Sequence, residues 1–122
     1  MPTTKNLMGA GLVPLQATSI LGSVASGLTA TGVGQSDALA LTSDLNVFST
    51  VATGTGARLQ ANLARGDEIT VANNGANALL VYPPTGAAIG TAATNAGVSV
   101  AAGKLGVFTL ITPTLFIASV GA

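Results

Sequence analysis

Short runs of β-prone residues, separated by turn residues such as glycine, proline, asparagine and aspartate, follow one another from residue 38 to the end of the chain. No window repeats large apolar residues at helical spacing beyond two turns, so helices are not expected. Short strands with turns about every 8–12 residues are typical of sandwiches and barrels. We therefore predict an all-β fold, a sandwich or jelly-roll-like small barrel of about eight short strands. The predicted strands are 38–42, 47–51, 57–61, 68–72, 78–82, 98–101, 107–112 and 115–120.

The clearest pair of strands flanks the asparagine-rich loop 73–77. Asparagine and glycine tolerate the positive φ of a tight turn, so strands 68–72 and 78–82 are predicted to pair as a hairpin. Pro83 should end the second strand, since proline cannot donate to the ladder. A second tight turn is predicted at 111–114, between the last two strands.

Charged side chains are scarce, with four Lys+Arg, four Asp+Glu, no histidine and no cysteine in 122 residues. An ordinary soluble domain carries roughly 25 % charged residues, and this chain carries 7 %. Without cysteine or histidine there is no zinc site, disulfide, thiol nucleophile or imidazole acid–base pair. Four scattered cations also provide no basic face for nucleic acid. We therefore predict a protein that is not an enzyme and binds no cofactor, metal ion or nucleic acid.

The apolar content is mostly small: the chain has 22 Ala, 16 Gly and 16 Thr, together 54 of its 122 residues. Even so, Leu79, Leu80 and Val81, like Val107 and Phe108, put large apolar side chains on both faces of their strands. A half-solvated sheet would alternate more cleanly. These strands are therefore either central, or covered on their second face by a neighbouring chain in a symmetric homo-oligomer.

Residues 1–26 are predicted to form an extended N-terminal arm, followed by a β domain at 27–122. The arm carries no charge after Lys5, but Pro14 and several glycines interrupt its apolar run. A membrane-spanning helix needs about 20 predominantly apolar residues. Neither a membrane anchor nor a signal peptide is therefore expected.

Three short motifs are better explained as turns. Residues 97–104 end in Gly-Lys like a phosphate loop, but the spacing is wrong and Leu105 stands where Ser or Thr would hold magnesium. The tripeptide 65–67 is Arg-Gly-Asp, an integrin ligand when displayed at a loop tip, at a place where a Gly-Asp turn is expected anyway. Asp37, Asp44 and Asn46 could share a calcium ion, but no calcium-loop pattern surrounds them.

The order of several segments resembles that of small virion proteins of tailed bacteriophages, of the head-decoration (cement) and fibre-associated kinds. The resemblance covers roughly residues 27–122 and contains no catalytic motif. It implies a β-rich subunit, commonly a trimer, that sits on a capsid lattice or is built into a tail or fibre. The segments that carry it are 35–46, 49–56, 66–68, 73–77, 81–83 and 100–104.

From this resemblance we expect a non-enzymatic structural protein on the outer surface of the capsid, which stabilises it by bridging neighbouring major capsid subunits. Its partners would be the major capsid protein and further copies of itself, most simply as a trimer, with neither nucleic acid nor membrane. The alternative is a tail-fibre, spike or neck component that acts as a receptor- or glycan-binding module. An exposed Tyr82 beside Asn73, Asn74 and Asn77 would favour that alternative.

The apolar side chains of the arm are the predicted interface residues. Glycines between them would let the chain follow a groove, either on the capsid or on its own oligomer, and the sequence leaves both open. These residues are Leu7, Met8, Leu12, Val13, Leu15, Ile20 and Leu21.

Overall fold

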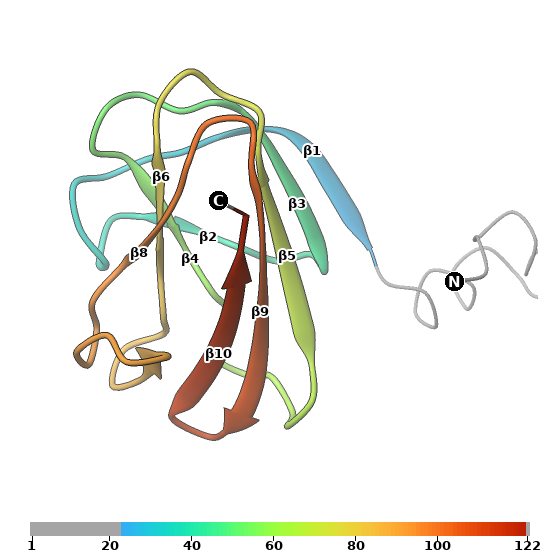
Figure 1. Cartoon of the computed structure of the whole chain (residues 1–122), viewed down its shortest axis with the longest axis vertical. Coiled ribbons are helices and arrows are strands. Elements are labelled where there is room, and N and C mark those ends of the chain that lie inside the picture. Colours follow the sequence, from blue (N-terminus) through green and yellow to red (C-terminus); the bar gives the residue numbers. More distant parts are fainter. Residues whose placement is uncertain (1–22, 122) are drawn as a thin grey trace, which may run out of the picture.

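The computed structural model describes residues 23–121 and shows an all-β chain in that range (Figure 1). Ten strands and no helix occur among these residues, which confirms the predicted class. The strands are β1 (Val24–Thr29), β2 (Leu39–Ala40), β3 (Leu45–Thr50), β4 (Gly56–Arg58), β5 (Glu68–Asn73), β6 (Leu79–Tyr82), β7 (Ala88–Ile89), β8 (Val98–Val100), β9 (Leu105–Thr112) and β10 (Leu115–Val120).

The chain alternates between two sheets for most of its length. β1, β3 and β5 belong to a six-stranded sheet of order β1-β3-β5-β9-β10-β7, while β2, β4 and β6 belong to a four-stranded sheet of order β2-β4-β6-β8. Neighbours in both series run parallel, so the first six strands wind as a solenoid-like stack of three coils. The architecture of these coils is therefore not clearly that of the sandwich or jelly-roll-like barrel predicted from the sequence. Antiparallel pairing of β9 with β5 and of β8 with β6 then ends the parallel part.

All eight predicted strands overlap a strand of the structure, but the sequence predicts neither β1 nor β7. Gly27 interrupts the β-prone pattern of β1, where it has a φ of +68° and where the register with β3 shifts. β7 is only two residues long and carries no detectable alternation. Because β1 begins at Val24, residues 24–26 of the predicted arm are part of the six-stranded sheet.

The predicted hairpin between 68–72 and 78–82 is wrong, because β5 and β6 lie in different sheets. The loop 73–77 instead forms a corner, where the chain passes from the six-stranded to the four-stranded sheet, and side-chain amides of its asparagines hold it in place. Asn73 Nδ2 donates to the carbonyl oxygens of Asn77 (2.8 Å) and Val100 (2.9 Å), and Asn77 Nδ2 donates to that of Val51 (2.8 Å). A Cβ on Gly75 would lie 2.8 Å from the side chain of Val51, so the corner closes only around glycine. The second predicted turn is confirmed: β9 and β10 pair as an antiparallel hairpin, with Leu115 opposite Thr112.

The core lies between the two sheets and draws on both. Alternate residues of β5 and β9 are buried, as expected for strands with one face on a core. All three phenylalanines come from the six-stranded sheet and are at most 1 % exposed. The largest core side chains are Phe48, Ile69, Val71, Ile89, Phe108 and Phe116 of the six-stranded sheet, and Leu79, Val81 and Val100 of the four-stranded sheet, with Leu59 after β4.

Candidate functional site

The seven predicted interface residues of the arm lie outside residues 23–121, and their role stays a prediction. The described part of the chain offers a different candidate surface. On β3, β5, β9 and β10, the residues that alternate with the buried ones point away from the core and form what we call the outer face. With Val24 of β1, it consists of Leu45, Val47, Ser49, Glu68, Thr70, Ala72, Leu105, Val107, Thr109, Ile111, Ile117 and Ser119.

The pairing register brings outer-face residues from distant parts of the chain side by side. One row crosses five neighbouring strands, each member opposite the next. A parallel row joins Ala72 to Val47 and Leu105, and another joins Thr109 to Glu68 and Ile117. The five-strand row is Val24, Leu45, Thr70, Val107 and Ser119.

The outer face is apolar and exposed. Among the described residues, five large hydrophobic side chains are exposed, and four of them lie here: Val24 (65 %), Ile117 (48 %), Leu105 (47 %) and Ile111 (40 %). The strands of this sheet contain a single charged residue, Glu68, which is exposed. Contiguous exposed apolar surface of this kind is typical of interaction sites.

Sequence reasoning found this face only in part. It pointed to apolar residues on both sides of strand 107–112 but not to Val24, Leu45 or Val47, which join the face through parallel pairing with earlier coils. The signal in the sequence was the presence of large apolar residues on both faces of this strand, which the structure divides between the core and the outer face.

The edge of the sheet next to the outer face is also open. Within residues 23–121, β1 is paired with β3 alone, so its other side has no strand beside it (Figure 1). The start of β1 is held by Asp44, whose Oδ2 accepts from the Ser23 N–H at 2.9 Å. In return, the Ser23 carbonyl oxygen accepts from the N–H groups of Asp44 (3.1 Å) and Leu45 (3.0 Å). An open edge beside an apolar face is a template for pairing with another chain.

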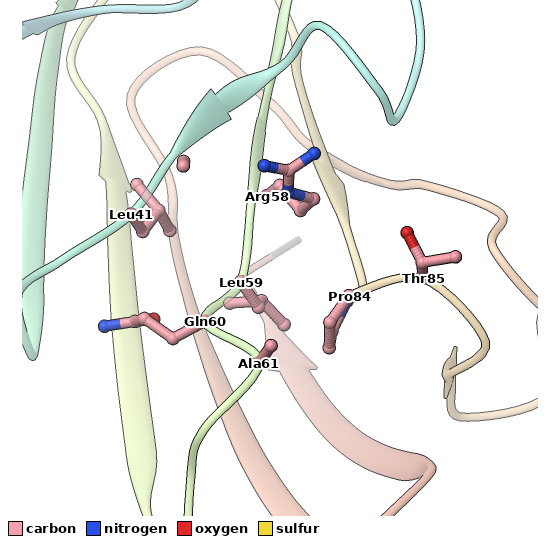
Figure 2. A pocket seen from close by; sticks show the side chains of 8 residues that line it. Leu41, Arg58, Leu59, Gln60, Ala61, Pro84 and Thr85 are labelled. Atoms are coloured by element: carbon pink, nitrogen blue, oxygen red, sulfur yellow. The ribbon is translucent and has the colours of Figure 1, made fainter.

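A pocket opens beside β4, but its polar groups do not converge (Figure 2). Arg58 Nη1 donates to the carbonyl oxygen of Gln35 at 3.2 Å, so this cation is tied to a loop. The Gln60 side chain points away from Pro84 and Thr85 (Figure 2), and its Nε2 donates to the carbonyl oxygen of Ser43 at 3.2 Å. The remaining lining comes from Ala40, Leu41, Leu59 and Ala61. This arrangement presents no set of groups for a specific ligand.

The possible calcium ligands Asp37, Asp44 and Asn46 hold separate parts of the backbone. Asp37 Oδ1 accepts from the N–H groups of Val33 and Gly34, each at 3.0 Å, as expected of a turn residue. Asp44 is engaged with Ser23, as described above. Asn46 is 1 % exposed and donates to the Ser43 and Thr70 carbonyl oxygens. Within residues 23–121, no group of three or more acidic, histidine or cysteine side chains is placed to hold a metal ion.

The other two motifs are turns. Residues 101–104 connect β8 to β9, with Gly103 at a φ of +77°, so the Gly-Lys pair does not precede a helix. In the Arg-Gly-Asp stretch, Gly66 has a φ of +89° and Asp67 Oδ2 accepts from the Ala64 N–H at 2.8 Å. This exposed turn leads into β5, as the sequence predicts.

The structure does not bring Tyr82 together with the asparagines of 73–77. They lie at opposite ends of β6, about 17 Å apart along an extended strand. The Tyr82 ring is half-buried over Gly56 and Gly97, where an added Cβ would lie 2.8 Å and 2.9 Å from ring carbons. The Asn73 and Asn77 amide nitrogens are used by the corner, which leaves Asn74 as the exposed asparagine of the three.

Over the range that the structure describes, there is no helix of the length and apolarity needed to cross a membrane. Comparison of the whole chain with protein-family models, with curated proteins and with solved structures finds no match.

Proposed function

We propose that this chain is a non-enzymatic structural protein of a bacteriophage particle, which decorates the capsid and stabilises it by bridging neighbouring major capsid subunits. The observation that supports this proposal best is the outer face, an apolar surface with one charged residue across a whole sheet. Obligate subunits present such surfaces to partners, whereas lone soluble domains seldom do. Because the outer face carries no cation, it suits a protein partner better than a nucleic acid.

Stabilisation would follow from mass action. A subunit that binds only the assembled lattice stabilises it by RT ln(1 + [L]/Kd) per site, about 2.7 kcal/mol at a hundredfold excess over Kd. Because a capsid offers many equivalent sites, modest binding at each one adds up over the particle.

The first experiment is the molar ratio of this chain to the most abundant protein in purified particles. A ratio near one, or a fixed simple fraction of one, supports a lattice-wide decoration protein. A handful of copies per particle contradicts it and favours the alternative, a tail, neck or fibre component that serves attachment.

A second experiment tests the outer face itself, by adding purified protein to capsids that lack it. Ile117→Lys and Leu105→Lys place a charge on the face, and a buried unpaired charge should weaken binding by about a hundredfold or more. Val33→Lys is the matched control, because Val33 is 88 % exposed in a loop outside the face. Equal capsid occupancy for all three variants would show that the outer face is needed neither for contact between copies nor for contact with the capsid.

The finer architecture is part of the proposal. We regard the two sheets as the layers of a sandwich-like or jelly-roll-like small barrel, since residues of both sheets share one core. An experimental structure of the assembled particle tests this, and a core that opens between the sheets would contradict it.

A further inference from the structure

We infer that the outer face is covered by residues 1–22 of a second copy of this chain. The inference rests on the proposed function in one respect: it takes the protein to work as an assembly. It goes further by naming the occupant of the face and the pairing that positions it. Three features support it: the place where the segment joins the sheet, its length, and the match of its side chains to the face.

The segment joins the sheet at the right place. Ser23, the residue that follows it, is fixed by three hydrogen bonds of 2.9–3.1 Å, one to the Asp44 carboxylate and two from the backbone N–H groups of Asp44 and Leu45. The next residue, Val24, is part of the outer face and is 65 % exposed. The residue to which the segment is joined therefore lies at the open edge of the sheet that carries the face.

The segment is long enough to cover the face of a neighbour. Extended chain spans about 3.3–3.6 Å per residue, so 22 residues reach about 70–80 Å. Six strands spaced about 4.8 Å apart make a sheet only about 24 Å wide. Even a segment that turns at Gly9, Gly11 or Gly22 can cross an adjacent copy from edge to edge.

The side chains match in polarity and in charge. The segment carries the seven large apolar residues named above and one charged side chain, Lys5. The face carries apolar and threonine side chains and one charged side chain, Glu68. Apolar packing that buries both charges requires them to meet, because a buried charge without a partner is strongly destabilising. The single charge on each side therefore predicts a Lys5–Glu68 ion pair between copies.

Exchange between copies follows from the direction of the chain. Hydrogen bonds to Asp44 and Leu45 hold Ser23 in line with β1, the outermost strand, so the segment is joined to the open edge of its own sheet. A return to the same face needs a reversal, whereas a neighbouring copy needs none. In a closed symmetric oligomer, each copy gives one segment and receives one, so every outer face is covered.

Carbodiimide coupling tests the pairing, because it joins a lysine amine to a carboxylate only when the two are in contact. The sequence has just two lysines, Lys5 and Lys104. Lys104 precedes Leu105, whose partner Ala72 lies four residues along β5 from Glu68, a separation of about 13 Å. A Lys5–Glu68 cross-link, identified by peptide mass spectrometry of the full-length protein, is the expected product.

Two variants then separate exchange from self-contact. Lys5→Arg removes the reactive amine but keeps the charge, and Glu68→Gln removes the carboxylate. Neither variant alone can form the cross-link, whereas the two chains co-expressed can form it only between copies. Restoration in the co-expressed sample is the expected result. Asp67→Asn, which changes the neighbouring exposed acid, is the control and should keep the cross-link.

Each other outcome overturns the inference. A cross-link in the parent protein that is lost in the co-expressed sample means that the segment covers its own face. No Lys5–Glu68 cross-link in the parent protein means that residues 1–22 do not lie over Glu68. If the cross-link fails while the protein still occupies capsids, only this inference fails; if the cross-link forms and the protein does not bind capsids, only the proposed function fails.

Discussion

The side-chain amide of Asn73 donates to the carbonyl oxygen of Val100 at 2.9 Å, which joins the six-stranded sheet to the four-stranded sheet by a fully buried hydrogen bond. Asn73 is 1 % exposed, and its Oδ1 accepts from the Gly75 N–H at 3.0 Å. One side chain thus satisfies three backbone groups at the corner between β5 and β6.

Asn73→Ala should therefore destabilise the subunit strongly. Each buried backbone group left without a partner costs about 1–3 kcal/mol, and the loss of three should lower the free energy of unfolding by at least about 2 kcal/mol. Urea unfolding followed by circular dichroism measures this. Asn74→Ala is the matched control, because Asn74 is exposed and its bond to Phe48 comes from the backbone N–H. Equal losses for both variants would mean that the Asn73 amide does not hold the corner.

The same corner should reject a methyl group at Gly75. A Cβ there would lie 2.8–2.9 Å from Val51, including its backbone nitrogen, so the neighbour cannot simply rotate away. Gly75→Ala should cost about 1–3 kcal/mol in unfolding free energy, the range for overpacking. At Gly34 no atom lies within 4 Å of an added Cβ, and Gly34→Ala should leave the thermal midpoint within about 2 °C of the parent. A Gly75→Ala protein that melts with the parent would contradict the packing described.

Phe116 and Ile117 are neighbours on β10 with opposite surroundings. Phe116 is 1 % exposed in the core, and Ile117 is 48 % exposed on the outer face. Phe116→Ala should cost about 3–5 kcal/mol in unfolding free energy. Ile117→Ala should change the stability of the isolated subunit by less than about 1 kcal/mol and instead weaken assembly, measured by light scattering after size exclusion. An Ile117→Ala subunit as unstable as Phe116→Ala would show that Ile117 belongs to the core.

Gln60 offers a substitution that should cost almost nothing. Its Oε1 is buried without a hydrogen-bond donor. Its Nε2 donates to the Ser43 carbonyl oxygen, which also accepts from Asn46 Nδ2 at 2.8 Å. Gln60→Met removes the unpartnered oxygen, keeps the shape and leaves Ser43 satisfied, so the unfolding free energy should stay within about 1 kcal/mol of the parent or rise. Calorimetry measures the change. A loss above about 2 kcal/mol would indicate that Gln60 makes a further bond through ordered water.

The sequence predicts the strands better than their partners. β-prone runs bounded by turn residues identified β5, β9 and β10, because such runs are local features of the sequence. It could not choose between a hairpin and a corner at 73–77, since asparagine and glycine suit both. That choice depends on Val100, which is 27 residues from Asn73 and hydrogen-bonded to it.

The candidate site, too, could be predicted within one strand but not across strands. The apolar outward residues of 107–112 were visible in the sequence, but their union with Val24 and Leu45 depends on a parallel register that no local pattern encodes. β1 was missed because Gly27 breaks the alternation of its six residues. The role of the arm residues remains a prediction.

The parallel coils also imply an order of unfolding. Each coil is stabilised by the coils on either side, as in solenoid proteins, and such arrays lose structure from their ends. Within residues 23–121, the coil of β1 and β2 has a neighbour on one side only, while β5 is paired on both sides. Amide hydrogens of β1 should therefore exchange with solvent sooner than those of β5. The coil that frays first is the one next to residues 1–22, so a partner bound there would protect the weakest part of the stack.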